Sequence, residues 1–150
     1  MTINRKSISR FIYLGARLIL GAVFIYASYD KLFHPKAFAD ILYNYQILPD
    51  SLINITALIL PWLELLIGVF LIIGFWMPGT VIWCNLLLVA YIGALSFNLA
   101  RGLDIQCGCF STAGRSSISI GTVLWDFVFL SLSIYLFVIV FGSKSGKRLK

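Results

Sequence analysis

Four apolar stretches, each close to the length that crosses a bilayer, constrain the fold of this chain more than any other feature. Roughly 20 helical residues cover the hydrocarbon core of a membrane. Lipid offers the backbone no hydrogen-bond partners, so apolar segments of this length are expected to be helices. The sequence therefore predicts an all-α integral membrane protein, a four-helix bundle with spans at Phe11–Ser28, Leu52–Phe75, Gly79–Phe97 and Ser119–Phe141.

Composition agrees with a single membrane domain. Of the 150 residues, 60% are hydrophobic and 12% are charged, which differs strongly from the balance of a soluble globular protein. This length has room for one domain, so we assign residues 1–150 to one transmembrane domain. The first span follows basic residues as a signal peptide would, but its apolar run is longer and contains Arg17, which favours a retained helix.

Basic residues at both ends of the chain predict its orientation. They are Arg5, Lys6 and Arg10 at the N-terminus, and Lys144, Lys147, Arg148 and Lys150 at the C-terminus. Four spans place both tails on one side, and the positive-inside rule assigns that side to the cytoplasm. We expect a multi-pass protein of a bacterial inner membrane whose loops 29–51 and 98–118 face the periplasm. The net charge of +6 then reflects topology and contact with anionic lipid rather than nucleic-acid binding.

The first outward loop contains the pattern of a short helix. Between Lys36 and Tyr45, the apolar residues Phe38, Ile41 and Leu42 precede Tyr45 at helical spacing. An amphipathic segment of this kind is typical of a helix that lies in the membrane interface. We therefore predict a short interfacial helix before the second span.

Three charged residues fall inside the predicted spans: Arg17, Glu64 and Asp126. Charges inside a membrane are costly, usually face the interior of a bundle, and mark either a pair or a functional site. We expect Arg17 to reach Glu64 and to fix the register of the first two spans. The alternative is that these charges line a proton path or a polar ligand pocket.

The segment Cys107–Gly108–Cys109 is the candidate redox site. One residue separates the two thiols, which is within the range that a disulfide spans, and Gly108 supplies backbone freedom for the small ring. Such a ring is strained, and strained, exposed disulfides are typically catalytic or regulatory. The third cysteine, Cys84, lies near the opposite end of its span, so we interpret it as a small buried hydrophobic residue.

Neighbouring charges predict how the cysteines are tuned. Arg101 and Arg115 flank the pair and would favour a thiolate, whereas Asp104 would oppose it. His34, in the other outward loop, is a candidate base. A metal site is the other interpretation of two close cysteines, but two thiolates and one histidine fall short of a closed tetrahedral set. We predict no metal.

The run Asn98–Gly102 followed by Cys107–Phe110 resembles the signature of the methylamine utilisation protein MauE family, within the wider group of DoxX-like membrane proteins. The resemblance extends over nearly the whole chain. It implies a four-helix bundle that works with a periplasmic thioredoxin-like partner to form disulfides in secreted enzymes. It also implies a catalytic pair with supporting residues: Cys107 and Cys109, supported by Gly108, Arg101, Phe110, Glu64 and Arg17.

Two classes of function remain open at this point. In the first, the protein is a membrane thiol-disulfide redox protein that acts through a mixed disulfide with its partner. A membrane quinone is then the candidate electron acceptor, although the sequence contains no quinone motif. In the second, the protein is a non-catalytic scaffold or assembly subunit of a redox complex. A transporter or channel would need more polar residues along the spans.

Overall fold

The computed structural model describes residues 5–102 and 120–142, and within these ranges the chain forms α-helices and no strand. The helices are α1 (Arg5–Phe33), α2 (Pro35–Tyr45), α3 (Asp50–Ile73), α4 (Met77–Ala100) and α5 (Ile120–Gly142). Four of them, α1, α3, α4 and α5, are long and apolar enough to cross a membrane. The predicted all-α fold with four membrane helices is confirmed.

The first span is longer than the sequence pattern predicted. Its apolar segment runs from Arg10 to Phe33, whereas the expected span stopped at Ser28 and left Lys31 in an outward loop. The structure instead places Lys31 inside α1 and buries it. The prediction was wrong here because a lysine near the end of an apolar run was interpreted as a loop residue.

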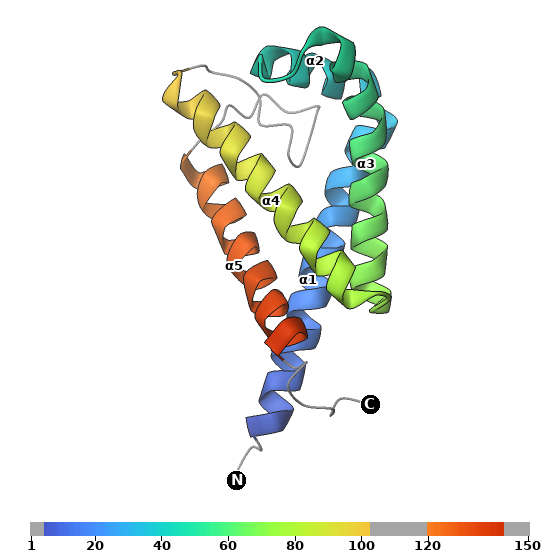
Figure 1. Ribbon diagram of the computed structural model, residues 1–150, viewed down its shortest axis with the longest axis vertical. Coiled ribbons are helices and arrows are strands. Elements are labelled where there is room, and N and C mark those ends of the chain that lie inside the picture. The colour runs from blue at the N-terminus through green and yellow to red at the C-terminus, as the bar shows by residue number, and fades with distance from the viewer. Residues whose placement is uncertain (1–4, 103–119, 143–150) are drawn as a thin grey trace.

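The helices form a bundle, and α2 lies at one end of it (Figure 1). Helix α1 packs mainly along α3, and α4 packs along α5. Helix α2 lies across the end of the bundle where α1 ends and α3 begins. The end of α4 and the start of α5 lie toward this same end, whereas α1 begins and α5 ends at the opposite one.

Two glycines bring α1 and α3 into close contact. A Cβ atom added to Gly68 would lie 2.9 Å from the Gly21 carbonyl oxygen, and one added to Gly21 would lie 2.9 Å from the Gly68 carbonyl oxygen. Such small residues allow membrane helices to approach at backbone distance. The pair also sets the antiparallel register of α1 and α3, with Gly21 opposite Gly68.

Helix α2 confirms the short helix predicted in the first loop. Pro35 occupies its first turn, where a missing N–H costs nothing, and Gln46 ends it in the left-handed conformation with φ 51°. Phe38, Ile41 and Tyr45 are buried. The apolar side of α2 therefore packs on the bundle, mainly against α3.

Candidate functional site

The predicted redox residues Cys107, Gly108, Cys109 and Phe110 lie outside the residues that the structure describes. What it does describe are the two helix ends that this segment joins. Helix α4 ends at Ala100 and α5 begins at Ile120, and both ends lie toward α2 (Figure 1). The cysteine-containing connection therefore starts and finishes on the α2 side of the bundle.

Arg101 links the start of this connection to α2. It follows the last residue of α4, and its Nη2 donates a hydrogen bond to Oε1 of Gln46 at 3.0 Å. The guanidinium also lies over the Phe97 ring, 5.4 Å from the centroid. A positive side chain is thus held between the C-terminal ends of α2 and α4.

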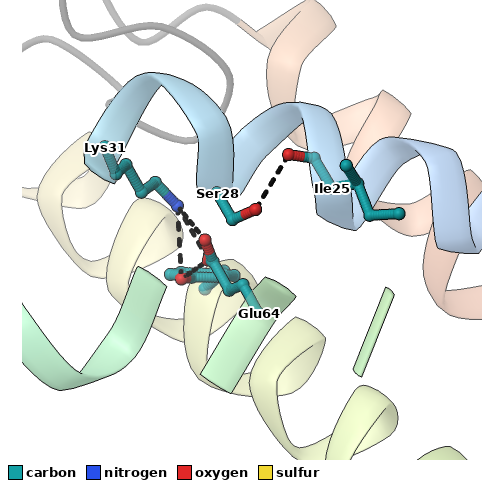
Figure 2. Close-up of polar contacts among 5 residues, drawn as sticks. Ile25, Ser28, Lys31 and Glu64 are labelled. Carbon is teal, nitrogen blue, oxygen red and sulfur yellow. Dashed lines mark hydrogen bonds and ion pairs between the residues drawn. The ribbon is translucent and has the colours of Figure 1, made fainter. Parts of the chain in front are cut away.

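A buried ion pair lies inside the bundle, between Lys31 of α1 and Glu64 of α3. Lys31 Nζ donates to both carboxylate oxygens of Glu64, at 2.7 and 3.0 Å, and each side chain is only 1% exposed. Figure 2 shows the two side chains pointing toward one another. The Tyr91 hydroxyl from α4 also donates to Glu64 Oε1, and Lys31 Nζ lies 3.4 Å from the Tyr91 oxygen. Three helices therefore meet at one polar cluster.

The expected pair between Arg17 and Glu64 is wrong, and the geometry of the helices explains why. In the register set by the two glycines, Glu64 lies level with Ile25, about 12 Å along the axis from Arg17. Side chains also tilt toward the N-terminus of their own helix. In antiparallel helices this tilt moves Lys31 and Glu64 toward each other and Arg17 away.

Arg17 binds the C-terminal end of α3 instead. Its Nε donates to the Leu71 carbonyl oxygen at 2.9 Å, and its Nη2 donates to the Ile72 carbonyl oxygen at 3.1 Å. The last carbonyls of a helix have no partners within it, and a cation there is favourable. Arg17 thus caps α3, next to Gly74 in the left-handed conformation with φ 81°.

Asp126 of α5 lies beside the same cluster. With Glu64 and Tyr91 it lines a cavity of about 30 Å³, which is large enough for one water molecule. Asp126 is buried, and its Oδ2 has no hydrogen-bond partner within residues 5–102 and 120–142. Each of the four long helices therefore supplies one member of a polar cluster: Lys31, Glu64, Tyr91 and Asp126.

An apolar cavity adjoins this cluster on the α2 side. It has a volume of about 250 Å³ and lies between α2, α3 and α4. Its walls include Phe38 and Tyr45 from α2, Leu60 from α3, and Ala94 from α4. Tyr91 lines both this cavity and the small one beside Asp126. Tyr91 is therefore shared between the apolar cavity and the cluster of buried charges.

Two other candidate residues have different environments. His34 is exposed, precedes α2, and lies 3.6 Å from the Asp30 carboxylate through Nδ1. Cys84 is buried in the core and accepts a hydrogen bond from Ser133 Oγ at 3.3 Å. The interpretation of Cys84 as a buried core residue is confirmed.

Sequence reasoning missed Lys31 and Tyr91 as members of the site. A signal for Lys31 was present, because Leu32 and Phe33 continue the apolar run beyond it. That continuation would have placed a lysine inside the span opposite the acidic residue of the next one. Tyr91 carried no such signal, since an isolated tyrosine in a span is also common at membrane interfaces.

Comparison with known proteins gives a consistent picture. A family model described as methylamine utilisation protein MauE matches residues 9–139. The methylamine utilization protein MauE of Paracoccus denitrificans is 33% identical over 120 residues, which are 79% of this chain and 64% of that protein. The protein of the same name from Methylorubrum extorquens is 34% identical over 94 residues, 62% of this chain and 50% of that protein.

A third relative, the methylamine utilization protein MauE of Methylophilus methylotrophus, is 28% identical over 135 residues, 89% of this chain and 69% of that protein. The chain thus aligns with between one half and about two thirds of the length of these relatives. No solved structure matches it. Since the family model covers most of the sequence, the chain belongs to the methylamine utilisation protein MauE family.

Proposed function

We propose that this protein is a membrane thiol-disulfide redox protein in which Cys107 and Cys109 exchange a disulfide with a thioredoxin-like protein in the periplasm. The observation that carries the proposal is the Cys107–Gly108–Cys109 sequence itself, in a connection between two membrane helices. A three-residue ring closes too small a loop to stabilise the fold much by entropy. A redox role accounts for the pair better than a structural one.

The proposed chemistry is thiol-disulfide exchange. A thiolate of one protein attacks the disulfide of the other, a mixed disulfide forms, and the second thiol then resolves it. One protein ends as the disulfide and the other gains two electrons and two protons as the dithiol. The exchange therefore balances without a further reactant.

The described part of the structure supports a role for Arg101 beside this chemistry. Its guanidinium is held by Gln46 at the start of the connection that carries the cysteines. A fixed positive charge favours a thiolate over a thiol when the two are close. We therefore propose that Arg101 tunes the reactivity of the pair.

The names of the relatives suggest a setting for this activity. Each of those compared is a methylamine utilization protein. We propose that this chain likewise helps to mature a secreted enzyme of amine metabolism by supplying its disulfides. Under this proposal the protein is a multi-pass protein of the bacterial inner membrane, and both termini lie in the cytoplasm.

Trapping the mixed disulfide tests the proposal. Replacing either Cys107 or Cys109 with alanine leaves one thiol. This thiol should attack a thioredoxin-like protein that lacks its resolving cysteine and whose remaining cysteine is activated as a disulfide with thionitrobenzoate, so that thionitrobenzoate leaves and a stable mixed disulfide remains. Non-reducing electrophoresis and mass spectrometry detect the product. Cys84→Ala is the matched control, because Cys84 is buried in the core, and it should leave trapping unchanged.

The double variant Cys107→Ala/Cys109→Ala separates this proposal from a scaffold. It should lose its effect on the redox state of the thioredoxin-like protein. A double variant that still binds the thioredoxin-like protein and changes its redox state as the unaltered protein does would contradict this. In that case the redox function is wrong and the protein is a non-catalytic assembly subunit.

A further inference from the structure

We propose that the apolar cavity between α2, α3 and α4 binds the ring of a membrane quinone, with the Tyr91 hydroxyl as its polar contact. This inference rests on the proposed function, because a dithiol that is to become a disulfide again needs a two-electron acceptor. It names the chemical class of that acceptor. The cavity, the buried charges behind it and the position of Tyr91 between them carry the proposal.

The size and lining of the cavity suit a substituted six-membered ring. An apolar cavity of about 150 Å³ accepts benzene, and this one measures about 250 Å³. Its walls are almost wholly hydrophobic, with Phe38, Leu60 and Ala94 among them. Exposed Ile47 and Ala90 also line it. The cavity therefore opens to the outside of the bundle, where an isoprenoid tail could extend into lipid.

The buried charges behind Tyr91 argue against a simple lipid tail as the occupant. An acyl chain gains nothing from a hydroxyl. An ion pair buried inside a membrane is costly, and such charges commonly mark a functional site. Lys31 and Glu64 are each 1% exposed and meet the Tyr91 hydroxyl directly. A quinone uses such groups because its oxygens accept hydrogen bonds and take up protons.

The Tyr91 hydroxyl can turn from Glu64 to a quinone oxygen, because a phenol O–H rotates about its C–O bond. Lys31 remains on Glu64 and balances its charge. In the overall step the two thiols lose two electrons and two protons and become a disulfide. The quinone gains two electrons and two protons and becomes a hydroquinone.

Photolabelling of the purified full-length protein with an azido-ubiquinone tests binding without any need for activity. The label should map by mass spectrometry to peptides of α2, α3 and α4 that line the cavity. Excess decylubiquinone should displace it, whereas decylbenzene, which has the tail and ring but no oxygens, should not. Equal displacement by decylbenzene would assign the cavity to any apolar chain and overturn the proposal.

Two variants test the geometry. Ala94→Phe fills the cavity and should lower labelling at least tenfold, while Val89→Phe places the same side chain at an exposed position of α4 and should not. Tyr91→Phe keeps the ring and removes one hydrogen bond, which is worth up to about tenfold in affinity. Circular dichroism identifies any variant that does not fold, and unchanged labelling in folded Ala94→Phe would refute the site.

The cysteine variants keep this inference distinguishable from the proposed function. Cys107→Ala/Cys109→Ala should bind the azido-ubiquinone normally but fail to reduce it when a dithiol protein is added. If the protein exchanges thiols normally but the azido-ubiquinone does not label it, the quinone site is wrong and the proposed exchange function stands. Normal labelling in a protein without thiol exchange would remove the exchange function instead.

Discussion

At the scale of single residues, the most informative feature is how the charges inside the bundle are distributed. Arg17 satisfies the end of a helix through Leu71 and Ile72, whereas Lys31 and Glu64 satisfy each other in the interior. The first contact has a structural explanation that is complete in itself. The ion pair between Lys31 and Glu64 lies beside a cavity and Tyr91, and this position favours a role in binding or chemistry.

Removing one partner of the buried pair should be much worse than removing both. Lys31→Met leaves the Glu64 carboxylate buried and unpaired, and we expect it to cost about 3 kcal/mol of unfolding free energy. Lys31→Met/Glu64→Met should recover most of that loss, because no unpaired charge remains. Unfolding in mixed SDS and dodecyl maltoside micelles measures both values.

Lys36→Met is the control for this comparison, since Lys36 is exposed on α2. Its effect should stay within about 0.5 kcal/mol. A Lys31→Met protein as stable as the Lys36→Met protein would show that the ion pair contributes nothing in the folded bundle.

At the scale of helices, the contact between α1 and α3 determines which residues meet. Gly21 and Gly68 set the register, and that register places Lys31, not Arg17, within reach of Glu64. Without Cβ atoms at these two positions the backbones approach closely. The polar cluster therefore depends on two glycines that never touch it.

Gly68→Ala should destabilise the bundle by about 1–3 kcal/mol, because the new methyl group would press on the Gly21 carbonyl oxygen and force the helices apart. The matched change Gly15→Ala adds the same group where nothing lies within 4 Å. It should be neutral or slightly stabilising, since alanine favours helix over glycine by about 1 kcal/mol. The same micelle unfolding experiment compares the two, and equal effects would contradict the close contact.

Much of the helical architecture could be predicted from the sequence, whereas the side-chain pairs inside the bundle could not. The length and apolarity of α3, α4 and α5 identify them as spans, and helical spacing identifies α2. Which side chains meet across α1 and α3 depends on their register, which a one-dimensional pattern does not contain. The extension of α1 to Phe33 was missed for a related reason, because a buried lysine and a loop lysine look alike in sequence.

At the scale of the whole molecule, the candidate functional features lie together at one end of the bundle. Helix α2, the apolar cavity, Arg101 and the helix ends at Ala100 and Ile120 all lie there. Under the proposed orientation this end faces the periplasm, where disulfides form. The protein then presents its thiols to soluble partners while its cavity opens to lipid.

A membrane-impermeant maleimide tests this orientation on intact spheroplasts. Cys107 and Cys109, once reduced, should be modified from outside in the Cys84→Ala background. In a variant that keeps only Cys84, the buried thiol should stay unmodified until the membrane is dissolved and the protein unfolded. Modification of the pair only after lysis would place the cysteines on the cytoplasmic side. Thiol exchange with a periplasmic partner would then be ruled out.

The most direct test of the central claim is the redox state of the Cys107–Cys109 pair during turnover. The purified protein, freed of quinone, is mixed with a reduced thioredoxin-like protein, quenched with acid, and alkylated before mass spectrometry of the peptide that carries both cysteines. We predict that the pair starts as a disulfide and becomes a dithiol as the added protein is oxidised in equal amount. A pair that stays in one state while the added protein changes would contradict the account.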